Sequence, residues 1–312
     1  MKKFSPAIIV ICLIGVILLA LLFSGHNQAR QTIDLTNVIN DNEGNVSTHV
    51  QDPNVLFFGF TVCINPQENV KNYMTFLDYL EKNTGYTLWP HFAVEEKIID
   101  KLSQGIVQFA ALEYGTYMLS RRKYGFVPIV SGLNEEGKAE CRSVIIAGKN
   151  SPIKKIENLK GKRFAFGNIS STSGHLIPRI ILHEHGLRLT DLANYAYTDS
   201  HYNCANAVAS GRFDAGCISQ TFADKLAAEG IIKIIYVSQA YPSFLIVANK
   251  EVPYHLLSEV KEVLLHFNPE KKALDYFNCE GMQIANGFIE TQQHNFDELE
   301  RWAQKFHFME GL

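Results

Sequence analysis

The sequence predicts an α/β protein of two lobes, between which the chain crosses twice, behind a hydrophobic N-terminal segment. From residue 54 onward, short apolar runs of strand length alternate with stretches that have the periodicity of half-buried helices. A second series of the same kind begins near residue 141, and further helices follow it toward the C-terminus. The 312 residues are enough for two lobes of ordinary domain size.

Composition and charge exclude several classes of protein. With 46% apolar and 20% charged residues, the chain is neither disordered nor a polytopic membrane protein. Its net charge of −3 comes without a long basic run, so the clustered Lys and Arg that a nucleic-acid partner requires are missing. The cysteines form no CxxC pair, so we expect no metal and no cofactor. Because export implies an oxidising compartment, one or two disulfides are an alternative, although buried free thiols are favoured.

Residues 1–30 are predicted to be an export signal or a membrane anchor. Two lysines precede an uncharged apolar run from Ala7 to Phe23, which is slightly long for a cleaved signal and slightly short for a membrane span. Both alternatives stay open. Residues 31–53 are polar and lack periodicity, so we expect a flexible tether there.

Lobe I is predicted to consist of residues 54–140 and 239–312, and is therefore discontinuous in sequence. Its elements alternate as strand, helix, strand, helix and strand over 55–60, 70–84, 86–92, 94–105 and 107–112. A strand over 244–248 and helices over 255–267, 270–277 and 296–306 follow the second lobe and must pack back on the first.

Lobe II is predicted from residues 141–238. Strands are expected over 143–147, 163–167, 195–197, 215–218 and 232–237, with helices between them. The chain then crosses between the lobes near Cys141 and near Ser238. Two such crossings permit the lobes to close on a ligand by a hinge motion.

The most informative loop joins the strand over 163–167 to the helix that ends near Gly186. It carries Ser170, Ser171, Thr172 and Ser173, so hydroxyl groups, backbone N–H groups and the positive end of a helix dipole can converge on one anion. The alternative is that Ser171 only caps the helix. Pro178 adds a second choice, since a helix begun at Thr172 would be kinked at the proline, and one begun near Pro178 would leave the hydroxyl residues outside it.

Several motifs resemble a known family in order and spacing. They are listed here: Ser143-Val144-Ile145-Ile146, Lys160-Gly161-Lys162-Arg163-Phe164-Ala165-Phe166-Gly167, Ser171-Thr172-Ser173-Gly174 with Pro178, Ser200-His201, and Gly211-x-x-Asp214-Ala215-Gly216. Weaker similarity extends from about Leu56 to about Gly287 and includes Tyr117 and Tyr241-Pro242. Together these segments resemble the phosphate/phosphite/phosphonate-binding proteins of ABC importers.

The resemblance implies the type 2 periplasmic-binding-protein fold and a set of ligand contacts. It implies that Ser171, Thr172 and Ser173 hold the oxyanion, that His201 reaches the ligand oxygens and that Tyr117 closes over the ligand from lobe I. The alternatives are that His201 is an ordinary surface or capping residue and that the ring of Tyr117 packs in the core. Tyr241 is a further candidate contact. Asp214 is interpreted as structural, because it lies at a turn from helix into strand, where Asp often accepts from backbone donors.

Two positions depart from the family. Glu95 stands where members often carry a tyrosine, and a carboxylate facing a dianion would repel it, so either Glu95 faces solvent or the ligand is not the usual one. Phe244 stands where phosphonate binders of this group often carry an aspartate, which puts recognition of an aminoalkyl group in doubt.

The function predicted from these features is that of a non-enzymatic, monomeric solute-binding protein. It would be periplasmic or otherwise extracytoplasmic, either free or tethered to the inner membrane, and would deliver a small tetrahedral oxyanion to an ABC permease. One alternative is a membrane-tethered sensor with the same binding chemistry. The other is an enzyme with Ser173 as nucleophile and His201 as base, but no Gly-x-Ser-x-Gly elbow, P-loop or GxGxxG supports it.

Overall fold

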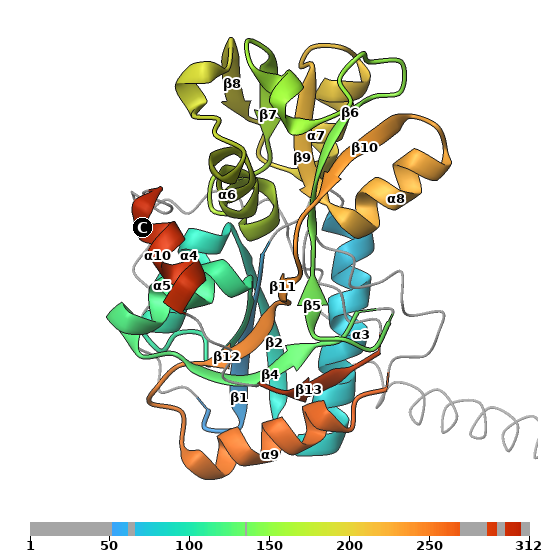
Figure 1. Cartoon of the computed structure of the whole chain (residues 1–312). Helices are drawn as coiled ribbons and strands as arrows, with labels where there is room; N and C mark the ends of the chain where they lie inside the picture. The colour runs from blue at the N-terminus through green and yellow to red at the C-terminus, as the bar shows by residue number, and fades with distance from the viewer. Residues whose placement is uncertain (1–51, 62–65, 135, 269–285, 292–296, 307–312) are drawn as a thin grey trace, which may run out of the picture. The chain divides into compact units, whose positions relative to one another are not determined.

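The computed structural model describes residues 52–61, 66–134, 136–268, 286–291 and 297–306 (Figure 1). All of them belong to one compact unit, Ser47–Leu312. The apolar N-terminal segment, almost all of the tether and the expected helix over 270–277 lie outside the described residues. Among the helices that the structure describes, none has both the length and the apolar character needed to cross a membrane.

The first sheet has six strands in the order β13-β4-β12-β3-β1-β2. β1 pairs in parallel with β2 and β3, whereas β12 runs antiparallel to β3 and β4, so the sheet is mixed. The strands are β1 (Val55–Thr61), β2 (Thr87–Ala93), β3 (Phe109–Leu112), β4 (Val127–Gly132), β12 (Leu245–Ala248) and β13 (Phe288–Glu290).

Helices cover both faces of this sheet, and we call the sheet with its helices lobe I. On one face, α3 (Pro66–Thr84) and α9 (Tyr254–Leu265) enclose an aromatic core in which Phe58 stacks on Phe60 and meets Phe76 edge-on. On the other face lie α4 (Glu95–Ser103) and α5 (Tyr114–Tyr124), whose apolar residues pack on β3 and β12. The periodic apolar positions noted in the sequence are the ones that these faces bury.

The second sheet has five strands in the order β10-β6-β9-β7-β8, and we call it with its helices lobe II. β7 is parallel to β8 and β9, and β6 is antiparallel to β9 and β10. The strands are β6 (Ser143–Gly148), β7 (Arg163–Phe166), β8 (Asn194–Tyr197), β9 (Ala215–Ser219) and β10 (Ile232–Val237). The helical elements are the 3-10 turns Ile156–Leu159 and Leu189–Asp191, the π turn η2 (Thr172–Leu176), α6 (Ile177–Glu184), α7 (His201–Ala209) and α8 (Gln220–Ala228).

The chain passes from one sheet to the other twice. β5 (Glu140–Cys141) precedes β6, and β11 (Tyr241–Pro242) follows β10. These two short strands pair antiparallel, with Tyr241 opposite Cys141, in a separate ladder that Figure 1 shows between the two sheets. The antiparallel direction of β12 follows from this return, because the chain re-enters lobe I against the direction of β3.

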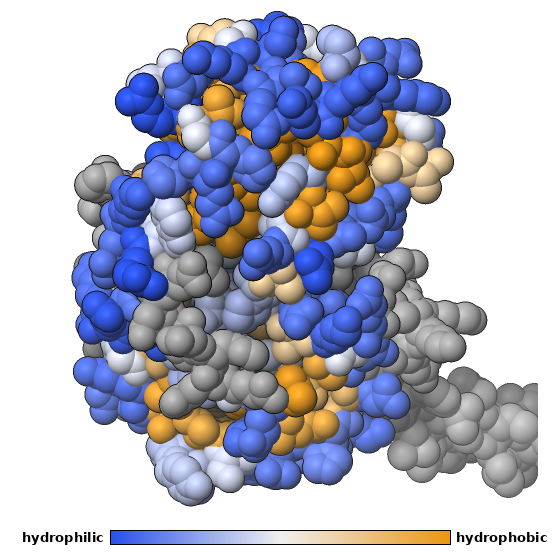
Figure 2. Space-filling view, in the orientation of Figure 1, coloured by the Kyte–Doolittle hydropathy of each residue, from blue (hydrophilic) through white to orange (hydrophobic). Residues whose placement is uncertain are grey.

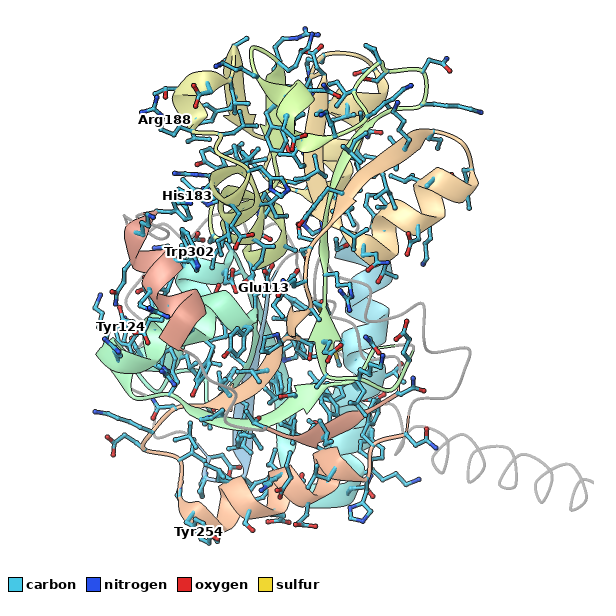
Figure 3. The ribbon with its side chains drawn as sticks, in the orientation of Figure 1. Glu113, Tyr124, His183, Arg188, Tyr254 and Trp302 are labelled. Atoms are coloured by element: carbon cyan, nitrogen blue, oxygen red, sulfur yellow. The ribbon has the colours of Figure 1, made fainter. Side chains whose placement is uncertain are left out.

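Helix α10 (Asp297–Lys305) contacts both lobes. On the lobe I side, Glu300 pairs with Arg121 and Arg122 of α5 at 3.5 and 2.6 Å. On the lobe II side, the ring of Trp302 packs against His183 of α6 at a centroid distance of 4.9 Å, and Figure 3 labels both residues where the two helices meet.

Asp214 has the structural role expected from its turn position. Its carboxylate accepts from the backbone N–H of Arg163 at 2.8 Å and from the guanidinium of the same residue. The salt bridge ties the turn before β9 to the start of β7. Figure 2 shows hydrophilic residues over much of this face of the protein, with apolar residues gathered in patches over both lobes.

Candidate functional site

The loop that carries Ser170, Ser171, Thr172 and Ser173, which we call the hydroxyl loop, leads into the π turn η2 immediately before α6. The Ser171 Oγ accepts from the N–H of Gly174 at 3.0 Å, so Ser171 is the cap residue, and the Leu176 N–H reaches back to the Ser171 carbonyl at 3.2 Å. Helix α6 then begins at Ile177, with Pro178 in its first turn, where the missing N–H costs nothing. The structure combines the two alternatives that Pro178 raised, because a π turn begins at Thr172 and the α-helix itself begins beside the proline.

Ser173 and His201 are in contact beneath this turn. The Ser173 Oγ lies 3.2 Å from the His201 Nε2, and the other ring nitrogen, Nδ1, accepts from the Ser219 N–H at 3.4 Å. Since a backbone N–H can only donate, the ring proton belongs on Nε2, which donates to Ser173. Burial lowers the pKa of His201 to about 4, so the ring is neutral at physiological pH.

A carboxylate from lobe I occupies the hydroxyl loop. Glu113 follows β3 directly and stands at the cap position of α5, but it makes no cap bond to its own helix. Its Oε2 accepts from the Thr172 N–H at 2.6 Å, and its two oxygens lie 3.2 and 3.4 Å from the Ser171 Oγ. The loop thus uses a backbone donor and a hydroxyl donor to bind an oxyanion, here one that the protein itself supplies.

Glu95 lies behind Glu113 as a second acidic residue. It is 7% exposed, and its Oε1 accepts from the backbone N–H of Glu113 at 3.3 Å. Burial and the neighbouring Glu113 raise the pKa of Glu95, and burial raises the pKa of Glu113 to about 7, although the donors of the loop oppose that rise. The alternative in which Glu95 faces solvent is therefore wrong. Its carboxylate binds the Glu113 backbone, and Glu113 rather than Glu95 engages the loop donors, so the repulsion expected between Glu95 and a dianion does not arise from direct contact.

The two lobes also meet through Thr172 and Gly115. The Thr172 Oγ1 accepts from the N–H of Gly115, the second residue of α5, at 3.0 Å. A Cβ on Gly115 would lie 2.6 Å from that oxygen, so only glycine permits this approach. Thr116 adds a longer contact, 3.5 Å from its Oγ1 to the Ser170 carbonyl. The start of α5 therefore sits directly on the hydroxyl loop.

Tyr241 and Cys141, from the two crossing strands, form the wall beside Glu113. The Tyr241 hydroxyl is buried and makes no hydrogen bond within the described part of the chain. A cavity of only about 10 Å³, the room of a single water, remains between Glu113, Thr172, Ser173, Tyr241 and Phe244. A larger cavity of about 530 Å³ lies on the other side of this wall and is lined by Arg142, Asp224 and Lys225 among others.

The remaining candidate, Tyr117, lies one turn into α5. It is 4% exposed and packs in the lobe I core with Ile98 and Phe126. Burial raises the pKa of its hydroxyl, and the neighbouring Arg121 opposes that rise. The structure thus brings Ser171, Thr172, Ser173, His201, Tyr241 and Glu95 around one point, and it places Tyr117 within the adjacent helix core.

Glu113 was missed in the sequence. A signal was present, because Glu113 directly follows a buried strand and precedes a helix, the same position in lobe I that the hydroxyl loop has in lobe II. Residues at the carboxyl ends of parallel strands converge on one edge of a sheet. No group of three or more His, Cys, Asp or Glu that could hold a metal ion occurs among the residues that the structure describes, and the described cysteines Cys141, Cys204 and Cys217 are free thiols.

Comparison with known proteins identifies the family of this chain. Residues 58–295 match the model of the family described as ABC transporter, phosphonate, periplasmic substrate-binding protein. A probable ABC transporter phosphite binding protein, PhnD1 of Prochlorococcus marinus (strain MIT 9301), is 26% identical over 187 residues, which are 53% of this chain and 61% of that protein. The chain thus matches somewhat less than two thirds of the length of that relative.

Two solved structures share the fold. One is PhnD1 from Prochlorococcus marinus (MIT 9301) in complex with methylphosphonate, with a TM-score of 0.69, 21% identity, and coverage of 83% of this chain and 100% of that one. The other is a binding protein component of an ABC phosphonate transporter from Pseudomonas aeruginosa, with a TM-score of 0.63, 22% identity, and coverage of 73% and 80%. Because the family model spans most of the sequence, the chain belongs to the phosphonate periplasmic substrate-binding proteins of ABC transporters.

Proposed function

We propose that this chain is an extracytoplasmic solute-binding protein that captures a small tetrahedral oxyanion, a phosphonate, phosphite or phosphate, and delivers it to an ABC permease. One observation carries the proposal: the Ser171-Thr172-Ser173 loop holds the Glu113 carboxylate through the Thr172 N–H at 2.6 Å. A site whose backbone and hydroxyl donors converge on a carboxylate has the donors that a phosphonate oxygen needs.

The ligand contacts are assigned to the residues around that loop. Thr172 supplies the backbone donor, and Ser171 and Ser173 supply hydroxyl groups. His201 holds Ser173 in place through its Nε2 proton and carries no charge. Tyr241, whose buried hydroxyl lacks a partner in the described part of the chain, is a donor for a ligand oxygen. Tyr117 packs in the lobe I core, so no ligand contact is assigned to it.

Ligand entry requires the lobes to separate. The four hydroxyl residues of the loop are at most 3% exposed, and the adjacent cavity has room for about one water. The two crossings, before β6 and after β10, support a hinge, because within the described part of the chain only these two short segments pass from one sheet to the other. We assign ligand entry to a rotation of the lobes about these segments. The N-terminal segment would direct the protein out of the cytoplasm or tether it to the inner membrane.

The geometry of Ser173 and His201 argues against catalysis by that pair. Their 3.2 Å contact has the length that a nucleophile and its base require. However, the Nδ1 of His201 accepts from a backbone N–H, so the Nε2 that faces Ser173 already carries the proton. A ring in this tautomer cannot remove the proton of Ser173.

The test is calorimetric titration of the full chain with methylphosphonate, phosphite, phosphate and sulfate. We expect binding of at least one of the three phosphorus oxyanions, and its absence for all three would overturn the proposed ligand class. A thermal-shift measurement provides a second readout, since a ligand at about 100 times its dissociation constant stabilises the folded protein by about 2.7 kcal/mol.

Two variants of Thr172 locate the binding site. Thr172→Ala and Thr172→Pro both remove the hydroxyl, and only the proline removes the backbone N–H, which it can do at the start of a helix without breaking it. Both are made with Glu113→Ala, so that no internal carboxylate competes for the same donor. We expect the proline variant to bind the oxyanion roughly 10- to 100-fold more weakly than the alanine variant. Equal affinities with intact melting curves would remove the Thr172 N–H from the site.

A further inference from the structure

Glu113 makes contacts that a structural carboxylate at its position would not make. A side chain at the cap of a helix ordinarily accepts from the first turn of its own helix. Glu113 instead crosses to lobe II, where its two oxygens face the Thr172 N–H and the Ser171 hydroxyl, all within 3.4 Å. No salt bridge involves Glu113 or Glu95 within the described part of the chain. The loop donors are therefore what offsets the desolvation of the Glu113 carboxylate.

The same contact joins the two lobes. Glu113 lies between β3 and α5 of lobe I, and the loop lies between β7 and α6 of lobe II. The Gly115 N–H donates to Thr172 beside it, so a backbone contact and a carboxylate contact meet at one residue of the loop. In Figure 3, Glu113 is labelled at the junction of the two lobes.

We propose that Glu113 is an internal ligand: in the ligand-free protein its carboxylate takes the place of the oxyanion in the Ser171-Thr172-Ser173 loop, so that an external oxyanion binds by displacing it. The proposal rests on the proposed function, since it concerns the same site. Glu113 is thereby a specificity-determining residue, because an anion must outcompete a carboxylate that is already tethered beside the donors.

Protonation weakens this internal ligand. A protonated carboxyl group is a poorer acceptor and carries no charge for the loop to stabilise, so acidification frees the donors for an external anion. The groups that face Glu113 are Glu95 from α4, Cys141 from β5, Tyr241 from β11 and, through Ser173, His201 from α7. Burial keeps the pKa of Cys141 near 12, places that of Tyr241 well above its ordinary value and lowers that of His201 to about 4. Glu113, whose pKa is raised to about 7, is therefore expected to titrate between pH 5 and 9, and burial together with Glu113 also raises the pKa of Glu95.

The first experiment needs no ligand. The amide resonance of Thr172 in the ¹H–¹⁵N spectrum of the full chain is followed from pH 5 to pH 9, in the wild type and in Glu113→Gln. We expect the Thr172 amide proton of the wild type to move downfield as the Glu113 carboxylate ionises, and we expect this titration to be lost in the variant. Glu259→Gln, which removes an exposed carboxylate of α9, is the matched control and should titrate like the wild type. A Thr172 titration that persists in Glu113→Gln would overturn the proposal.

The second experiment measures competition by calorimetric titration with methylphosphonate at pH 8 and at pH 5.5. If Glu113 occupies the loop in about 90 to 99% of the ligand-free molecules, Glu113→Ala tightens binding about 10- to 100-fold at pH 8, since apparent affinity falls with the competent fraction. The advantage should shrink at pH 5.5. The ratio of the variant's dissociation constant to that of the wild type at each pH is independent of the protonation of methylphosphonate itself. Melting curves of the variant and of the isosteric Glu113→Gln show whether either substitution impairs folding.

The two experiments separate the two proposals. Equal methylphosphonate affinities of wild type and Glu113→Ala at pH 8 would overturn the internal ligand while leaving the binding function intact. A Thr172 amide that follows Glu113, together with no methylphosphonate binding by either protein, would leave the internal ligand in place and overturn phosphonate binding.

Discussion

The close approach of Gly115 to Thr172 makes a quantitative prediction about the contact between the lobes. A Cβ on residue 115 would lie 2.6 Å from the Thr172 Oγ1, but 3.4 Å from the Thr172 Cβ and Cγ2, which is ordinary contact. Gly115→Ala therefore clashes with one atom only, the hydroxyl oxygen. Thr172→Ala removes that atom, so the second substitution should relieve the clash created by the first.

The expected energies follow from the geometry. Gly115→Ala forces the start of α5 and the hydroxyl loop apart, and this overpacking should lower the unfolding free energy by about 1–3 kcal/mol. The higher helix propensity of alanine offsets about 0.5–1 kcal/mol of that loss. Thr172→Ala leaves the buried Gly115 N–H without its acceptor, at a cost of about 1–3 kcal/mol. In the Thr172→Ala background the clash is gone, and Gly115→Ala becomes neutral or stabilising. The two substitutions should therefore couple by about 1–3 kcal/mol.

The assay is urea unfolding of the full chain for the four members of the double-mutant cycle, monitored by circular dichroism. Unfolding free energies that are additive within about 0.5 kcal/mol would refute the reasoning, because residues in contact couple by more than that. Additivity would mean that α5 and the hydroxyl loop do not meet in solution.

The remaining predictions concern titration and the α10 contact. The folded-state pKa of Glu113, about 7, exceeds the ordinary value of 4.5, so its contribution to stability is complete below about pH 4.5 and is lost as the pH rises through about 7. The unfolding free energy of the wild type should therefore fall relative to that of Glu113→Gln between pH 5 and pH 8. A difference in unfolding free energy that stays constant over this range in urea unfolding would contradict the prediction. Glu300, 5% exposed at the side chain, pairs with Arg121 and with Arg122, which is 67% exposed. Solvent screens the pair with Arg122, so we expect Glu300→Ala to lower the unfolding free energy by only about 1–3 kcal/mol in urea unfolding. The exposed control Glu157→Ala should lower it by less than about 0.5 kcal/mol. Equal losses for the two variants would show that Glu300 does not hold α10 to α5.

Most strands and helices were accessible from the sequence because their signal is local, but α5, β4 and β13 were not predicted. The apolar run at β1 and the spaced apolar positions of α3 each report burial of one face, and that periodicity depends only on near neighbours. The hydroxyl loop was accessible for the same reason, since it lies between a strand and a helix with its donors adjacent in sequence. The family resemblance, carried by these local motifs, is confirmed by the family model.

Strand direction was not accessible in the same way. β6 and β12 are buried apolar runs like β1, but they pair antiparallel with their neighbours, β6 with β9 and β10, and β12 with β3 and β4. A strand buried on both faces shows the same apolar run in either direction. The direction depends on where the chain returns from the other sheet, and that is a property of the topology.

The sequence by itself determined most of the element pattern, the family and the loop whose donors converge on an anion. Only the tertiary structure decided what those donors hold, because Glu113 lies 59 residues from Thr172 along the chain and reaches it only when the two lobes meet. The orientation of Glu95 was decided in the same way, since its acceptor role toward the Glu113 N–H exists only once β3 and α4 are packed together. Contacts between residues distant in sequence leave no periodicity along the chain, and the charge of a side chain does not reveal whether it will face water or another carboxylate.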